Sequence, residues 1–378
     1  MNHRSFDVVV AGGGVIGTAI AWRCARRGLS VAVIDDDPGH GSSWAAAGLL
    51  APITEAHYGE EILLRLNVAS ADMYPDFVSE LTGETGDDVG YTRCGTLLVA
   101  RDSDENRALD DVFAYQQRLG LTAKRLRGSE CHSLEPALAP GIRGGILVES
   151  DHQIDNRALG SSLRIACEKS GVVIEDVRVS RIEVDGGRAV GAALSTGERV
   201  DAGTVVIAAG SCSVEIGGIP TEEFPLRPVK GQLLHLKSPD GTSIVSHNVR
   251  GFDCYLLDRG DGRAVLGGTV EERGYDSRIT FAAVHDLLRD GYELVPGLYD
   301  YELAEIAVGF RPGTPDNAPI LGQTSIPGLV AATGHFRNGF LLAPVTAVAI
   351  ERLIVDGVAD DRVAAFAPGR FRREGPGS

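Results

Sequence analysis

The first candidate for chemistry is a glycine-rich stretch near the amino terminus. Gly12, Gly14 and Gly17 form a G-x-G-x-x-G pattern between a predicted strand and a predicted helix. Such glycines allow a tight turn, the approach of backbone N–H groups to a pyrophosphate, and close packing of the helix on the strand. Asp35 ends the next predicted strand about 20 residues further on, where a carboxylate accepts hydrogen bonds from ribose hydroxyls. The pattern predicts a dinucleotide site, and by itself it does not distinguish NAD from FAD.

Two further segments favour FAD. Residues 41–49 supply two hydroxyls, Ser42 and Ser43, and a run of small residues against which a flat ring and a diphosphate can lie. An alanine-rich helix capped by either serine is the alternative for this stretch. Residues 334–340 join a predicted buried strand to a helix, whose free N–H groups stabilise negative charge on a bound flavin.

The composition excludes several classes of protein. Thirty-six basic and 52 acidic residues give a net charge of −16, which disfavours nucleic acid and anionic membrane surfaces as partners. The 6 cysteines are scattered and contain no C-x-x-C, as expected of reduced thiols in a soluble cytoplasmic protein. No paired histidines have ligand spacing, so no metal site is predicted. No signal peptide or membrane span is expected either.

Apolar periodicity and turn residues predict the helices and strands that position these segments. A strand, helix and strand at the start indicate a parallel sheet, and alternating strands later in the chain indicate an antiparallel one. The predicted strands are 5–11, 30–35, 205–209, 231–237, 252–259, 263–270, 303–310 and 329–333, and the predicted helices are 15–27, 109–119, 159–166, 281–294 and 343–356.

Seven stretches of the chain together resemble the D-amino-acid oxidase family of FAD-dependent oxidoreductases, and within it the glycine oxidases of bacterial thiamine synthesis. They are VVVAGGGVIGTAIAW, SSWAAAGLLAP, TVVIAAG, PVKGQLL, CYLLDR, AVGFRPGTPDNAPILG and AATGHFRNGFLLAP, and they extend almost from end to end of the sequence.

The resemblance implies an α/β fold with a discontinuous, Rossmann-like FAD-binding domain (1–87, 144–219 and 306–378). It is joined to an α+β substrate domain with an antiparallel sheet (88–143 and 220–305). A homotetramer is implied by resemblance only. The cofactor-binding residues that the resemblance and the fingerprint give are Gly12, Gly14, Val15, Ile16, Gly17, Asp35, Asp36, Ser42, Ser43, Ala47, Gly48, Leu49, Val179, His335, Phe336, Arg337, Asn338, Gly339, Phe340 and Leu341.

For the substrate, the resemblance implies that Arg311 binds the carboxylate, that Tyr255 hydrogen-bonds the same group, and that Arg337 is a further contact. A planar guanidinium binds a carboxylate with two hydrogen bonds and fixes the α-carbon over a flavin. Taken alone, Arg311 could equally be a strand-end arginine paired with Asp316, and Tyr255 an ordinary cross-strand aromatic. Asp253, Cys254 and Val270 are expected to border the pocket.

The implied reaction is oxidation of glycine, sarcosine or a small D-amino acid by hydride transfer, with molecular oxygen as acceptor. It needs orientation rather than an acid–base residue, and a backbone role is favoured for His335. Relatives with covalent flavin use a cysteine near the position of Arg311, where this sequence has none, so FAD is expected to bind non-covalently. A dehydrogenase that uses a quinone or carrier, a plain NAD-dependent dehydrogenase and a non-catalytic flavin-binding scaffold remain alternatives.

Overall fold

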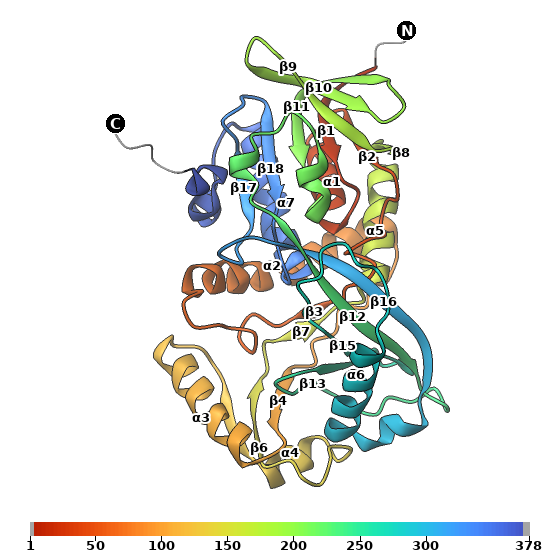
Figure 1. Ribbon diagram of the computed structural model, residues 1–378, viewed down its shortest axis with the longest axis vertical. Coiled ribbons are helices and arrows are strands. Elements are labelled where there is room, and N and C mark those ends of the chain that lie inside the picture. Colours follow the sequence, from red (N-terminus) through yellow and green to blue (C-terminus); the bar gives the residue numbers. More distant parts are fainter. Residues whose placement is uncertain (1–3, 373–378) are drawn as a thin grey trace.

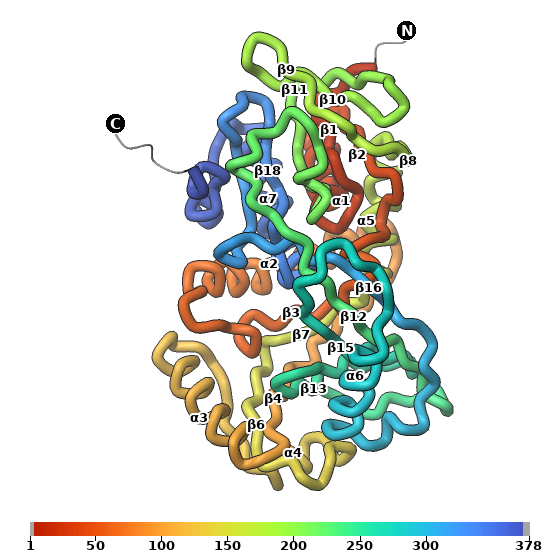
Figure 2. Tube along the Cα trace, in the orientation of Figure 1, coloured from red at the N-terminus to blue at the C-terminus, as the bar shows by residue number. Residues whose placement is uncertain are grey.

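Residues 4–372 of the computed structural model are described here. They form two eight-stranded sheets, one in the upper and one in the lower half of Figure 1. The upper half contains red, green and blue strands side by side, so it is assembled from the beginning, the middle and the end of the chain (Figure 1). The continuous trace in Figure 2 shows the chain passing between the two halves several times.

The upper sheet has a parallel centre in the order β18-β11-β1-β2-β8, with β17 antiparallel to β18 at one edge. Its central strands are almost continuous runs of Val, Ile and Ala, as expected for strands covered on both faces. The predicted strand–helix–strand unit at the start of the chain is confirmed. The bounds are β1 (Arg4–Ala11), α1 (Val15–Arg26), β2 (Val31–Asp35), β8 (Val173–Asp176), β11 (Arg199–Ile207), β17 (Ile320–Gln323) and β18 (Leu329–Thr333).

Helices cover one face of this sheet and a small antiparallel layer covers the other. Ile20, Phe77, Leu163 and Leu342 from the four helices meet in one apolar cluster on the first face. Strands β9 and β10 and two short 3-10 helices pack on the second face. The bounds are α2 (Glu61–Thr85), α5 (Asn156–Lys169), α7 (Gly339–Val355), β9 (Val179–Asp185), β10 (Arg188–Leu194), η1 (Gly210–Glu215) and η2 (Thr221–Glu223).

The lower sheet has the order β16-β12-β15-β14-β13-β4-β6-β5 and is antiparallel except where β13 pairs with β4. Helices α3, α4 and α6 surround it, and the long strands β12 and β16 extend from it toward the upper sheet (Figure 1). The bounds are β4 (Thr96–Ala100), α3 (Ser103–Arg118), β5 (Lys124–Arg127), α4 (Gly128–Leu134), β6 (Gly144–Val148), β12 (Arg227–Lys237), β13 (Asn248–Arg250), β14 (Tyr255–Asp258), β15 (Arg263–Gly267), α6 (Phe281–Leu294) and β16 (Glu302–Gly313).

The smaller elements join these layers. A two-stranded ribbon of β3 (Leu49–Leu50) and β7 (His152–Gln153) connects the halves, and three 3-10 helices complete the described chain: η3 (Pro296–Asp300), η4 (Asp361–Phe366) and η5 (Pro368–Phe371). No helix within residues 4–372 has the length and apolar character needed to cross a bilayer.

Helix α7 begins four residues earlier than its predicted start at 343, although Pro344 lies inside it. Proline removes one backbone donor, which leaves the Phe340 carbonyl without its helical partner. The Tyr74 hydroxyl of α2 donates to that carbonyl at 2.5 Å, and the Ser70 hydroxyl donates to the Leu341 carbonyl at 2.6 Å. Helix α2, which was not predicted from the sequence, therefore stabilises the start of α7.

The alternative of a helix at residues 41–49 is wrong, because residues 41–45 form turns. The division into two domains stays a prediction. Strands β6 and β16 both belong to the lower sheet, whereas the predicted boundaries at 144 and 306 would place β6 and most of β16 in the FAD-binding domain. Sheet membership depends on hydrogen bonds between distant strands, which local sequence patterns do not reveal.

Candidate active site

The glycine fingerprint lies at the carboxyl end of β1. Gly12 has a φ of +116°, and a Cβ on it would lie 2.4 Å from the Ala208 carbonyl oxygen. A Cβ on Gly17 would lie 1.9 Å from the Gly12 carbonyl oxygen, so α1 can pack this closely on β1 only with glycine there. The Val15 N–H, at the free amino-terminal turn of α1, donates to the Ser43 hydroxyl at 3.0 Å. The loop thus presents a helix start of the kind that binds a pyrophosphate.

Asp35 ends β2 beside this loop. Its carboxylate accepts hydrogen bonds from the Gly13 N–H at 2.5 Å and from the Asp37 N–H at 2.8 Å, so its position is fixed by backbone. Asp36 is ion-paired with Arg178 at 2.8 Å, and the next residue, Val179, is buried at the start of β9. Acidic and apolar groups from distant parts of the chain therefore meet where a nucleoside would lie.

The serines of residues 41–45 have separate contacts. Ser43 reaches α1, whereas the Ser42 hydroxyl donates to the Phe310 carbonyl of β16 at 2.5 Å. Gly48 has a φ of +78°, and a Cβ there would lie 2.0 Å from the Ile154 carbonyl oxygen. Residues 42–48 thus pass between the two sheets in close contact with backbone.

Residues 335–341 follow β18 and start α7. The imidazole of His335 is buried and its Nε2 lies 3.0 Å from the Thr346 hydroxyl. Burial lowers the pKa of His335 to about 3, so the ring stays neutral at physiological pH. This agrees with a structural rather than an acid–base role for His335. Phe336 has a φ of +48°, and its N–H donates to the Pro312 carbonyl at 3.2 Å, which joins this turn to the end of β16.

A single cavity of about 590 Å³ connects these features with the lower sheet. Gly17, Asn338 and Leu341 are not among the residues that line it, so their place at the cofactor stays a prediction. The predicted residues that do line it are Gly12, Gly14, Val15, Ile16, Asp35, Asp36, Ser42, Ser43, Ala47, Gly48, Leu49, Val179, Tyr255, Arg311, His335, Phe336, Arg337, Gly339 and Phe340.

Arg311 lies on β16 with its guanidinium over the adjacent strand β12. A Cβ on Gly231 would lie 2.3 Å from Arg311 Nη1, so the glycine provides the space that the guanidinium occupies. Nη1 donates to the Thr269 carbonyl at 2.9 Å, and within residues 4–372 no carboxylate forms an ion pair with Arg311. The alternative of a pair with Asp316 is wrong, because Asp316 pairs with Arg370 at 2.9 Å.

Tyr255 begins β14 and its ring lies against the glycines that end β15. The point where a Cβ of Gly268 would stand is 3.3 Å from the Tyr255 hydroxyl and 3.6 Å from Arg311 Nη2, so the two groups converge. Across the described chain the hydroxyl makes no hydrogen bond to protein, and burial raises its pKa. Tyr255 and Arg311 therefore offer donors to a ligand at the same end of the cavity.

Arg337 also lines the cavity, but carboxylates of the protein already hold it. Its guanidinium pairs with Glu60 at 3.0 Å and lies 3.9 Å from Glu55. Glu55 also pairs with Arg250 at 3.4 Å. Thus Glu55 and Arg250, together with His57, are lining residues that the sequence analysis missed. No motif identifies them. For two of them the sequence contains one signal, which is that they lie next to stretches that resemble the oxidase family. Glu55 comes three residues after SSWAAAGLLAP, and Arg250 comes four residues before CYLLDR.

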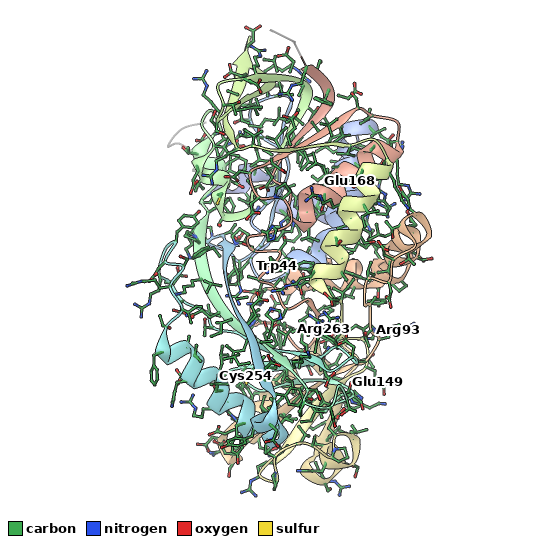
Figure 3. The ribbon with its side chains drawn as sticks, turned by 90° about the vertical axis from the view of Figure 1, so that its right-hand side faces the viewer. Trp44, Arg93, Glu149, Glu168, Cys254 and Arg263 are labelled. Atoms are coloured by element: carbon green, nitrogen blue, oxygen red, sulfur yellow. The ribbon has the colours of Figure 1, made fainter. Side chains whose placement is uncertain are left out.

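The expected border of the pocket is confirmed. Asp253, Cys254 and Val270 line the cavity, and Asp253 is ion-paired with Arg101 at 2.6 Å. Burial raises the pKa of Cys254 to about 12, so this thiol is unreactive. In Figure 3, Trp44 lies at the level where the two halves of the molecule meet, and Cys254 lies in the lower half. The cavity lining includes residues from both halves, such as Gly12 after β1 and Cys254 before β14.

A parallel sheet with this fingerprint, joined to an antiparallel sheet that supplies an unpaired arginine, defines a dinucleotide-dependent enzyme. Residues 7–353 match the family model described as FAD dependent oxidoreductase, DAO. The chain belongs to this family. Its cofactor is FAD, and the glycine loop, the start of α1 and the small residues 45–48 fit that group. Within the part of the chain that the structure describes, no cluster of His, Cys, Asp and Glu has a metal-binding arrangement.

The chain is similar to known glycine oxidases. The glycine oxidase of Geobacillus kaustophilus is 31% identical over 361 residues, which cover 94% of each chain. A crystal structure of glycine oxidase from the same organism superposes with a TM-score of 0.91 at 29% identity, over 97% of this chain and 99% of that one. The "Bifunctional protein ThiO/ThiG" of Trichormus variabilis is 34% identical over 97% of this chain but only 55% of its own length. The chain thus spans about half of that relative.

Proposed function

We propose that this FAD-dependent oxidoreductase oxidises the carbon–nitrogen bond of glycine, sarcosine or another small amino acid with one carboxylate, with oxygen as the electron acceptor. The products are an imine, which hydrolyses to the 2-oxo acid and ammonia or amine, and hydrogen peroxide. The single observation that carries the proposal is the guanidinium of Arg311, which has no carboxylate partner within residues 4–372 and converges with the Tyr255 hydroxyl at one end of the cofactor cavity.

The charges of the cavity support one carboxylate per substrate. Arg250 and Arg337 are neutralised by Glu55 and Glu60, whereas Arg311 has only carbonyl partners within residues 4–372. A charge-assisted pair between Arg311 and a carboxylate satisfies that charge and orients the substrate. A second carboxylate on the substrate would lie near the carboxylates of Glu55 and Glu60, which would repel it. Arg337, predicted as a substrate contact, is therefore proposed as a residue of the pocket wall.

When bound, FAD supplies the acceptor for a hydride from the substrate α-carbon. The residues of the chain bind, orient and shield the substrate. Arg311 and Tyr255 fix the carboxylate, and the strands that carry them hold the two groups in place. No acid–base residue is needed if the amine arrives neutral, and the buried, neutral His335 is consistent with that scheme.

The test is hydrogen peroxide release in air-saturated buffer with glycine, sarcosine and a panel of small D-amino acids. Peroxide supports the oxidase proposal. Bleaching of the flavin under anaerobic conditions without peroxide in air indicates a dehydrogenase with another acceptor. No bleaching with any of these amines refutes the proposed substrate class.

Several finer expectations remain proposals. A role in thiamine synthesis is supported by the likeness to the ThiO/ThiG protein over 97% of this chain. Non-covalent attachment of FAD and a homotetramer are proposed on the resemblance described above, and a cytoplasmic location is proposed on the scattered cysteines. The division into an FAD-binding and a substrate domain is also a proposal, supported by the two separate sheets.

A further inference from the structure

Residues 51–57, called here the pocket segment, connect the cofactor loop to α2 and contribute Glu55 and His57 to the cavity. The segment has almost no regular secondary structure, so other parts of the chain must hold its backbone groups. Its carbonyls accept from side chains on three sides: Ile53 from Gln116, Glu55 from Arg337 and His57 from Tyr115. The backbone N–H groups of Ile53 and Thr54 are held by another residue.

That residue is Asp151, which is fully buried in the connection between β6 and β7. Its carboxylate accepts from the Ile53 N–H at 3.1 Å, the Thr54 N–H at 2.6 Å and the Thr54 hydroxyl at 2.7 Å. Within residues 4–372 no cation pairs with it. A buried carboxylate without a cation is costly unless hydrogen bonds compensate, so the three bonds to the pocket segment stabilise it.

The backbone that Asp151 fixes leads directly to the charged groups of the cavity. The Thr54 carbonyl accepts from the Arg250 guanidinium, and the next side chain, Glu55, pairs with Arg250 at 3.4 Å and approaches Arg337 at 3.9 Å. A shift of the pocket segment would therefore separate Glu55 from both arginines. Arg250 would then be free to compete with Arg311 for the substrate carboxylate, whereas Arg337 would keep its ion pair with Glu60.

We propose that Asp151 is a positioning residue for substrate binding. Its carboxylate holds the pocket segment so that Thr54 and Glu55 keep Arg250 paired and prevent it from competing with Arg311 for the substrate carboxylate. This inference rests on the proposed function of the site. Asp151 does not touch the cavity, so it acts only through the segment.

Protonation of Asp151 should also make substrate binding depend on pH. The pKa of Asp151 is raised to about 7. Burial is the main cause and the nearby Glu55 adds to it, whereas the hydrogen bonds from Thr54 and Ile53 act in the opposite direction. The neighbouring imidazoles of His57 and His152 have pKa values lowered by burial, and Arg250 faces the segment from β13. As the pH falls through about 7, Asp151 takes up a proton and can no longer accept all three bonds. Substrate binding should then weaken.

The experiment is a comparison of Asp151→Asn with wild type and with Glu223→Gln as the control. An amide keeps the size of the carboxylate but turns an NH₂ group toward N–H donors, so at least one bond is lost. Glu223 is equally buried and also accepts from a backbone N–H, that of Ser325, but it does not line the cavity. For the amine that wild type oxidises, Asp151→Asn should raise KM by about tenfold or more. Its kcat and FAD content should be unchanged. The additional rise of KM as the pH falls through about 7, beyond the rise caused by protonation of the substrate amine, should be absent. Glu223→Gln should keep the wild-type KM and pH profile.

An Asp151→Asn enzyme that binds FAD and keeps the wild-type KM at every pH overturns the proposal, and so does an equal rise of KM in both variants. If Asp151→Asn does not fold, Thr54→Val removes only the hydroxyl bond, and an unchanged KM in that variant counts against the role. If wild type oxidises no amine, the proposed function fails. Whether Asp151 holds residues 51–57 in place is then tested separately by the rate of amide hydrogen exchange in that segment. Faster exchange in Asp151→Asn than in Glu223→Gln supports it, and equal exchange refutes it.

Discussion

Replacing Gly231 with alanine should displace Arg311 without altering the cofactor end of the cavity. The added Cβ would stand 2.3 Å from Nη1 and 2.6 Å from both Cζ and Nη2 of Arg311. Ordinary van der Waals contact begins at 3.4 Å, so the guanidinium must move by about 1 Å. A misplacement of that size in a substrate-binding group costs about 100-fold in rate, which corresponds to about 2.7 kcal/mol of transition-state binding.

The assay is kcat/KM for the best substrate, together with the FAD content and the thermal stability of each variant. Gly313→Ala is the control, because Gly313 lies on the same strand as Arg311 and its Cβ would meet Val229 instead, at 2.9 Å. That variant should keep most of its activity. The Gly231→Ala/Arg311→Ala double variant should be scarcely worse than Arg311→Ala, because both changes remove the same contact. A fully active, FAD-loaded Gly231→Ala enzyme would refute the placement of the substrate carboxylate at Arg311.

Four further predictions concern the rest of the cavity. Arg311→Ala should abolish turnover or raise KM strongly while FAD stays bound, and unchanged kinetics would remove Arg311 from the site. Tyr255→Phe should cost only about three- to tenfold in kcat/KM, because the arginine carries the charge recognition; complete inactivity would contradict this. Asp35→Ala should weaken FAD affinity, as measured by flavin loss on dialysis, since it removes the acceptor that also orders Gly13; normal retention counts against a ribose contact. Acid precipitation should release all the yellow colour, and colour left in the pellet would disprove non-covalent attachment.

Sequence patterns were sufficient to predict those elements whose determining residues lie close together in the chain. The G-x-G-x-x-G loop could be predicted because its strand, glycines and helix follow one another in the chain, and a Cβ on Gly17 would lie 1.9 Å from the Gly12 carbonyl oxygen of the same loop. The parallel strands could be predicted from their apolar runs, and α6 from its periodicity between 281 and 294. In contrast, α2 has Pro75 in its interior, and Pro344 obscured the start of α7. The start of α7 depends on tertiary hydrogen bonds from α2, such as that from the Tyr74 hydroxyl to the Phe340 carbonyl.

The sequence by itself determined a dinucleotide-binding protein with two segments that favour FAD, and the family resemblance added Arg311 and Tyr255 as residues that bind a carboxylate, together with an amine substrate. Only the tertiary structure decided which cavity charges are free. Glu55, Asp151, Arg250 and Arg337 are far apart in the chain, and their ion pairs and hydrogen bonds form only when the two sheets meet. The physical reason is that local periodicity specifies which face of an element is buried, whereas the pairing of charges depends on distances between elements that fold together.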